Sequence, residues 1–153
     1  MPISPHVQRL RECVGTDLLL IPSVAVMIRD DDGRILLVRD ADHGKWITVG
    51  GAIEIDESPA DAAVREATEE ANVTVRLRHL LGVAAGPEFR VTYSNGDETA
   101  YVSIIYEGEV VAGTPEPDGD EVTEARWFAL GELAAVDLSD LTRALLIEVG
   151  ILT

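Results

Sequence analysis

The sequence predicts an α/β fold in which a mixed β-sheet lies between layers of helix. Two observations support this prediction: apolar runs typical of buried strands recur along the chain, and strands and helices mix without a strict βαβ alternation. The length of 153 residues fits a single domain, residues 1–153, in which residues 1–19 form an N-terminal extension that carries a helix. We expect no further boundary, because no linker, repeat or low-complexity tract interrupts the chain.

The first predicted elements are a short helix and a β-hairpin. Residues 5–14 carry apolar side chains at helical spacing, which predicts an amphipathic helix. The apolar runs 23–30 and 34–40 flank the turn sequence Asp31-Asp32-Gly33, which predicts a hairpin. Both runs are too apolar for a sheet with one solvated face, so we expect them inside a sheet that is covered on both faces.

A strand and a helix follow the hairpin. Residues 45–49 predict a short strand that ends at Gly50-Gly51. Residues 58–71 then predict a helix, because Ser58 is a favourable N-cap and the next residue, a proline, suits the first helical position. Asn72 follows, and asparagine tolerates the left-handed conformation that ends many helices.

Strands dominate the rest of the chain. Further β-like runs lie at 73–85, 88–93 and 99–111. The last two are joined by a turn that contains Asn95-Gly96, which is a strong hairpin signal. A final strand at 125–130 precedes an amphipathic helix at 139–149.

Composition and charge limit the classes of partner. The net charge of −16 argues against binding to a nucleic-acid polymer, which requires clustered cationic side chains. The sequence shows no apolar run long enough to span a bilayer and no apolar signal core near its start. The single cysteine, Cys13, excludes an internal disulfide, and we expect it to be buried. These features predict a cytoplasmic protein with a small-molecule substrate and no membrane partner.

The helix expected at 58–71 carries a cluster of acidic residues. On a helical wheel Glu66, Glu69 and Glu70 share one arc. The opposite arc, which we expect to pack on the sheet, consists of Ala60, Val64, Ala67 and Ala71. Like charges one turn apart repel, so the cluster favours a bound cation, and carboxylate oxygens suit Mg²⁺ or Mn²⁺. Taken alone, the pattern is also typical of a solvated acidic helix.

Two neighbouring features fit the interpretation of the acidic cluster as a metal site. Gly50 and the glycine after it have no β-carbon, so their backbone can lie beside the helix and offer the Gly50 carbonyl to the same ion. Arg65 can pair with Glu57 or Glu69 and hold a carboxylate in the orientation that binds metal. The glycines and the acidic helix together predict one site.

The complete string resembles the signature of a known family. Written G-x5-E-x7-R-E-U-x-E-E-x-G-U, with U apolar, the pattern is matched by Gly51, Glu57, Arg65, Glu66, Ala67, Glu69, Glu70 and Val73. This looks like the box of the Nudix (MutT-like) hydrolases. Six fixed residues would coincide by chance at on the order of one position in ten million. Two positions depart from the family pattern, Asn72 in place of glycine and Val49 in place of a common proline.

The resemblance implies a fold, a reaction and a set of residue roles. It extends from about residue 20 to about residue 150 and implies a Nudix-type α/β/α sandwich. The implied reaction is metal-dependent hydrolysis of a nucleoside diphosphate linked to a moiety X. The implied metal ligands are Glu66, Glu69, Glu70 and the Gly50 carbonyl, with Glu57 and Arg65 positioning them.

The catalytic base and the substrate contacts are less narrowly defined. Glu70 and Glu66 are candidates for the base inside the box, and Glu121 resembles a position where some relatives carry an extra ligand or base. Glu121 is equally interpretable as one exposed acid among several in an acidic loop. For the substrate we expect contacts from Arg39, Lys45 and Trp46.

Several alternatives remain open at the level of sequence. The substrate can be a nucleotide sugar such as ADP-ribose or a (d)NTP, since no base-reading element is evident, and we lean towards the diphosphate-linked class. A non-catalytic Nudix module that senses a nucleotide is the alternative function. Processing of RNA 5′ ends fits poorly with the net charge of −16. A homodimer is expected only by similarity to related proteins.

Overall fold

The computed structural model describes residues 3–153, so the first two residues of the predicted N-terminal extension lie outside the described residues. The strands are β1 (Leu19–Arg29), β2 (Ile35–Asp40), β3 (Trp46–Ala52), β4 (Thr74–Ala84), β5 (Arg90–Thr92), β6 (Glu98–Ala112) and β7 (Val122–Phe128). The helices are α1 (Pro5–Val14), α2 (Pro59–Ala71) and α3 (Asp140–Glu148), and two short 3₁₀ segments are η1 (Pro87–Phe89) and η2 (Leu130–Ala135).

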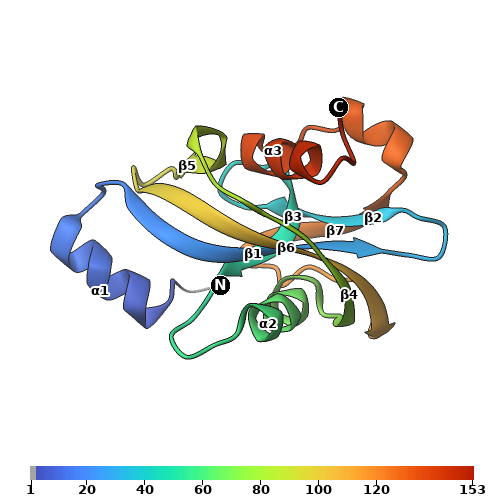
Figure 1. Cartoon of the computed structure of the whole chain (residues 1–153), viewed down its shortest axis with the longest axis horizontal. Coiled ribbons are helices and arrows are strands. Elements are labelled where there is room, and N and C mark those ends of the chain that lie inside the picture. Colours follow the sequence, from blue (N-terminus) through green and yellow to red (C-terminus); the bar gives the residue numbers. More distant parts are fainter. Residues whose placement is uncertain (1–2) are drawn as a thin grey trace.

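The strands form one mixed sheet between two helical layers (Figure 1). The order is β4-β6-β1-β3-β2-β7, and β5 pairs with β6 beside this path. Strands β1 and β6 run parallel, with Val24 opposite Ile104, whereas the other pairs are antiparallel. Helix α2 covers one face and α3 the other (Figure 1), which confirms the predicted α/β/α sandwich.

The core consists of two clusters, one on each face of the sheet. Along β1 the side chains alternate between them: Val26 belongs to the cluster under α2, and Met27 belongs to the cluster under α3. Strand β2 does the same with Leu36 and Leu37. All four side chains are fully buried, which confirms that these apolar runs are covered on both faces.

Two predictions about the strands need correction. The turn after β1 forms, but β1 and β2 pair only at Arg29 and Ile35, because β3 lies between them in the sheet. The strand predicted to end at the glycine pair continues through it to Ala52. Gly50 pairs with Ala25 of β1 and Gly51 pairs with Val24, so β3 continues through both glycines because they remain paired with β1.

The predicted helix ends and the Asn95-Gly96 turn agree with the structure. Ser58 accepts a hydrogen bond from the Asp61 amide at 3.1 Å, and Asn72 ends α2 in the left-handed conformation with φ 55°. The turn that contains Asn95-Gly96 joins β5 to β6. Cys13, expected to be buried, is exposed on α1. None of the helices described in the structure is long and apolar enough to cross a membrane.

Candidate functional site

The acidic residues of α2 divide between two faces of the helix. Glu66 has no solvent exposure and Glu70 is only 6% exposed, whereas the Glu69 side chain is 39% exposed. The buried face also includes Ala62, Ala63, Ala67 and Ala71, whereas Ala60 is exposed. The predicted packing face is thus confirmed for Val64, Ala67 and Ala71 but not for Ala60. Glu66 and Glu70 also lie on the side that packs towards β3, where small alanines leave room for their carboxylates.

The glycine pair of β3 lies directly against these buried carboxylates. The Gly50 amide donates to Oε2 of Glu70 at 3.1 Å. A β-carbon added at Gly51 would lie 2.3 Å from Oε1 of Glu66, and one added at Gly50 would lie 2.2 Å from the Val24 carbonyl oxygen. Only glycine fits at either position, because any side chain would displace the carboxylate or the neighbouring strand.

Arg65 holds several carboxylates of the site together. Its guanidinium donates to both oxygens of Glu57, at 2.7 and 2.9 Å, and to the Ala52 carbonyl at 3.0 Å. Its Nη1 donates to Oε1 of Glu66 at 2.9 Å and to Oε2 of Glu69 at 3.1 Å. The planar fork of arginine satisfies these diverging acceptors at once, which lysine cannot do. Arg65 therefore links the loop before α2 to two glutamates of the helix.

The electrostatics of the site follow from this packing. Burial raises the pKa of Glu66 to about 7, although Arg65 opposes the shift. Burial and the neighbouring charge of Glu66 raise the pKa of Glu70 well above its usual range. The hydrogen bonds from Arg65 lower the pKa of Glu57 and, in turn, raise that of Arg65. The carboxylates of Glu66 and Glu70 are thus costly to ionise without a cation, whereas that of Glu57 ionises readily.

The residues present fit a divalent cation. Oε2 of Glu66 is buried and has no hydrogen-bond partner among the described residues. An orphaned carboxylate oxygen beside a second buried carboxylate is the hard ligand that Mg²⁺ or Mn²⁺ prefers. Among residues 3–153, no three acidic, histidine or cysteine residues stand together as a ready metal cluster. Arg65 contacts Glu66 and Glu69, so their carboxylates are oriented by an arginine in this structure.

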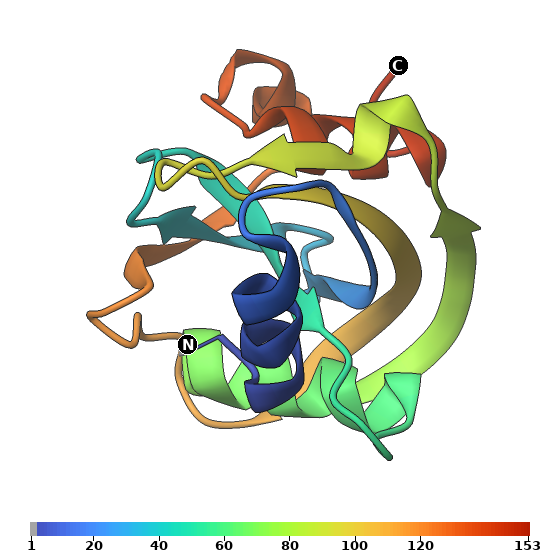
Figure 2. The ribbon, with the colours of Figure 1, turned by 90° about the vertical axis from the view of Figure 1, so that its left-hand side faces the viewer.

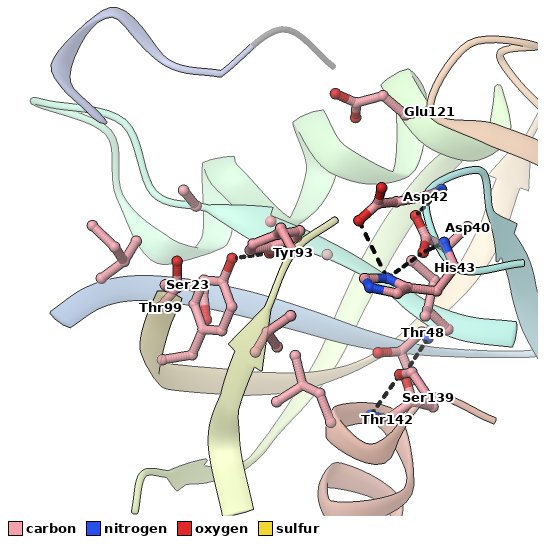
Figure 3. A pocket seen from close by; sticks show the side chains of 18 of the residues that line it. Ser23, Asp40, Asp42, His43, Thr48, Tyr93, Thr99, Glu121, Ser139 and Thr142 are labelled. Atoms are coloured by element: carbon pink, nitrogen blue, oxygen red, sulfur yellow. Dashed lines mark hydrogen bonds and ion pairs between the residues drawn. The ribbon is translucent and has the colours of Figure 1, made fainter. Parts of the chain in front are cut away.

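A cleft of about 910 Å³ adjoins the glycine pair, with Gly50 and Glu70 in its lining. Strands β1, β3 and β6, the loop before β3, the β5–β6 turn and the start of α3 contribute its walls. The volume is in the range of small-molecule sites. In Figure 3, Asp42 and His43 lie to the right of Tyr93, and Thr142 lies below them. The cleft is the candidate substrate site because it reaches the buried carboxylate of Glu70.

Of the four predicted site residues outside the acidic helix and its glycine loop, two line the cleft and two do not. Lys45 lines the cleft, with its ammonium 2.7 Å from Oδ1 of Asp137. Glu121 also lines it, on the same side as Asp42 (Figure 3). Arg39 and Trp46 are not among the lining residues.

The positions of Arg39 and Trp46 have clear physical reasons. Arg39 donates to the Gly44 carbonyl at 3.0 Å and to Glu124 at 2.7 Å, so its guanidinium is held at the surface. Trp46 packs edge-on against Phe128, with ring centroids 4.8 Å apart, and joins the core under α3. Both residues therefore have partners within the protein, and their contact with the substrate stays a prediction.

Sequence reasoning missed a polar bridge across the cleft. Asp42, in the loop between β2 and β3, accepts a 3.0 Å hydrogen bond from the Ser94 amide in the β5–β6 turn. His43 Nδ1 lies 3.4 Å from Oδ2 of Asp40 and 3.3 Å from Oδ2 of Asp42. The two loops are about fifty positions apart in the chain, so only the run Asp40-Ala41-Asp42-His43 hinted at a polar loop.

A known protein family matches most of this chain. The family profile described as "NUDIX domain" matches residues 19–147, which is most of the chain. The chain belongs to the Nudix family. The Nudix match begins at the first residue of β1 and leaves α1 outside it.

Individual Nudix relatives agree with this assignment. A MutT-like protein of Streptomyces ambofaciens is 43% identical over 112 residues, covering 73% of this chain and 66% of that protein. The chain thus spans about two thirds of that relative's length. An ADP-ribose pyrophosphatase of Methanocaldococcus jannaschii is 32% identical over 134 residues, 85% of this chain and 75% of that one. A crystal structure of a MutT protein from Methanosarcina mazei Go1 has a TM-score of 0.70 and 26% identity, covering 87% of this chain and 94% of that chain.

Proposed function

We propose that this Nudix protein is a Mg²⁺-dependent pyrophosphohydrolase that cleaves a phosphoanhydride bond in a nucleoside diphosphate linked to a moiety X. One observation carries the proposal: the buried carboxylates of Glu66 and Glu70 face a glycine pair at the edge of a large cleft. A pair of carboxylates buried at this depth is stable as anions only when a cation joins them. Mn²⁺ is an alternative ion, because the same oxygen ligands accept it.

We base the proposed residue roles on the arrangement of the site. Glu66, Glu70 and the Gly50 carbonyl would hold the ion, with Glu69 joining them from the exposed side of α2. Glu57 would act through Arg65, which positions the Glu66 carboxylate. When bound, the cation supplies charge neutralisation on the phosphates and lowers the pKa of a water. Glu70, Glu66 and Glu121 are the candidates to accept the proton of that water, since two line the cleft and the third lies behind it.

The substrate is proposed to be a nucleotide sugar such as ADP-ribose rather than a (d)NTP. The cleft is lined by many carboxylates, including Asp40, Asp42 and Asp97, and its lysine is paired with Asp137. A triphosphate brings more negative charge into this surface than a diphosphate ester does, so the ester is favoured. The relative from Methanocaldococcus jannaschii is named an ADP-ribose pyrophosphatase, which is consistent with this choice.

The cellular setting is part of the same proposal. A net charge of −16 and a single cysteine fit a cytoplasmic enzyme that acts on a free nucleotide without binding a nucleic-acid polymer. A homodimer remains the expected assembly by similarity alone. Gel filtration with light scattering measures the assembly directly.

A nucleotide panel tests the function. The protein is incubated with ADP-ribose, other nucleotide sugars and (d)NTPs, each with Mg²⁺ or Mn²⁺, and the products are identified by mass. We expect AMP and ribose 5-phosphate from ADP-ribose, and a loss of turnover of about 100-fold or more in Glu70→Gln. The matched control Glu148→Gln changes an exposed glutamate of α3 and should retain activity. Full turnover in Glu70→Gln would refute the proposed metal helix.

One outcome of the panel would support the alternative function. If nucleotides bind but none is hydrolysed with either ion, the protein is a nucleotide-sensing module. The complete set of box carboxylates argues for the enzyme, because loss of a ligand is the simplest route to a binding-only site.

A further inference from the structure

Helix α1 forms one wall of the cleft although it lies outside the family match. Ile3, Ser4, Val7 and Arg11 are lining residues of the cleft, whereas the family match begins only at residue 19. We call these four residues the α1 wall. In Figures 1 and 2, α1 stands beside the end of the sheet at which β1 begins. The cleft therefore has a wall that the rest of the domain does not supply.

Arg11 fastens this wall to the sheet. Its Nη1 donates to the carbonyls of Gly15 and Asp17 at 3.1 and 2.7 Å. Its Nη2 donates to the Glu98 carbonyl at 2.7 Å and to Oγ1 of Thr99 at 3.1 Å. Its Nε lies 3.6 Å from a carboxylate oxygen of Asp97. Four of the five guanidinium N–H groups thus have a hydrogen-bond acceptor, and the fifth, on Nε, faces the Asp97 carboxylate as an ion pair, so the charge of Arg11 is already paired within the protein.

The contacts of Arg11 continue into the cleft. Thr99, which accepts from Arg11, lies on β6 two residues before Tyr101, and the Tyr101 hydroxyl is hydrogen-bonded to that of Tyr93. Burial raises the pKa of both phenols, so both stay protonated at neutral pH. Helix α1 and the tyrosine pair are thus both attached to the same segment of β6.

The lining beside α1 suits an uncharged ring. Val7 and Ile21 supply apolar surface, and Ser23 and Ser103 form a buried hydroxyl pair 2.8 Å apart. The cation of this wall, Arg11, has four hydrogen bonds within the protein and an ion pair with Asp97. Apolar surface with a few hydroxyls matches a sugar or a base, whereas a phosphate needs unpaired donors or a cation.

We infer that the α1 wall binds the uncharged ring at the far end of the substrate, with Arg11 as the positioning residue that sets how close the wall stands. This inference rests on the proposed function and adds a specificity determinant to it. Val7 is the part of the wall that contacts the ring, because it lies on the cleft side of α1 and is partly buried, whereas its neighbour Gln8 is exposed.

The test introduces a tryptophan on the cleft side of α1 in one variant and on its exposed side in another. Val7→Trp narrows the cleft, and Gln8→Trp adds an equal ring on the exposed side. Dissociation constants for ADP and ADP-ribose are measured by calorimetry, and kcat and KM for ADP-ribose are measured with Mg²⁺. We expect Val7→Trp to raise KM about tenfold or more with kcat within about twofold of the parent, and Gln8→Trp to change neither.

The two ligands identify which ring lies at the α1 wall. If Val7→Trp weakens ADP-ribose but not ADP, the ring is the sugar of X. If it weakens both equally, the ring is the base. Equal behaviour of Val7→Trp and Gln8→Trp towards both ligands would overturn the inference while leaving the proposed function intact.

A second pair of variants tests Arg11, and it keeps the inference testable if Val7→Trp does not fold. Arg11→Lys keeps the charge but leaves most of the acceptors unpaired, so KM should rise with little change in kcat. Arg9→Lys is the matched exposed control. An unchanged KM in Arg11→Lys would remove its positioning role. If the parent binds ADP-ribose without hydrolysing it, and Val7→Trp still weakens binding, the role of the α1 wall in binding is supported and the proposed hydrolysis is refuted.

Discussion

Gly51 and Glu66 lie so close that a β-carbon placed on Gly51 would stand 2.3 Å from Oε1 of Glu66. The strand and the helix meet at this point, and the buried carboxylate occupies the space that a side chain would need. The contact links the backbone of β3 to the acidic face of α2. It makes the position of the Glu66 carboxylate depend on a residue that carries no functional group of its own.

Gly51→Ala should therefore disturb the site without removing any ligand. The added methyl must displace the Glu66 carboxylate, so we expect turnover to fall by at least about tenfold and stability by about 1–3 kcal/mol. Steady-state kinetics and urea unfolding measure the two effects. Gly82→Ala is the control, because a β-carbon there meets nothing within 4 Å. Normal turnover in Gly51→Ala would show that the carboxylate tolerates displacement.

Arg65→Lys should separate charge from geometry. Lysine keeps the positive charge but cannot reach Glu57, Glu66 and the Ala52 carbonyl together. We expect kcat to fall by about 10- to 100-fold, with divalent-ion activation shifted to higher concentration. Titrating Mg²⁺ against the initial rate measures both. The same change at Arg34, whose partner is Asp30 in an exposed turn, should leave the rate unaltered.

The Asp42–Ser94 bridge should give stability that depends on pH. The side-chain and backbone hydrogen bonds from Ser94 lower the pKa of Asp42 below its usual 3.8. A lowered acid pKa means that the stabilisation is fully present above pH 3.8 and is lost as the pH falls through the folded-state pKa. We expect Asp42→Asn to cost about 1 kcal/mol at pH 7 and progressively less below pH 4.

Urea unfolding at a series of pH values measures this difference. His43 and Asp40 also face Asp42, so the comparison is made against Asp42→Asn rather than against the pH profile of the parent alone. A stability difference that stays constant down to pH 3 would show that the bridge does not depend on the ionised carboxylate.

Asn72 should be replaceable by glycine but not by alanine. Its φ of 55° and ψ of 35° are left-handed, a conformation that glycine adopts freely and alanine does not. We expect Asn72→Gly to keep stability and turnover near those of the parent, and Asn72→Ala to lose about 1 kcal/mol. Thermal unfolding compares the three proteins. A similar loss in both variants would point to the asparagine side chain rather than to the backbone.

Local sequence patterns were enough to predict most helices and strands and to recognise the Nudix signature. Ser58 and Asn72 mark the ends of α2, and their signals act within a few residues of the helix, so they could be read without the fold. The spacing from Gly51 to Glu70 identified the box for the same reason. Such patterns are local, and neighbouring residues in a helix have a known angular relation.

Which of these groups are buried, and which residues they face, depends on contacts between segments that are far apart in the chain. The wheel could not show that Glu66 and Glu70 turn towards β3, because the insertion of β3 between β1 and β2 is a long-range pairing. Arg39 and Trp46 were assigned to the substrate by residue type, but Glu124 and Phe128 of β7 contact them in the structure. The α1 wall and the Asp42–Ser94 bridge likewise join segments far apart in sequence, and their contacts exist only once the chain has closed around the cleft.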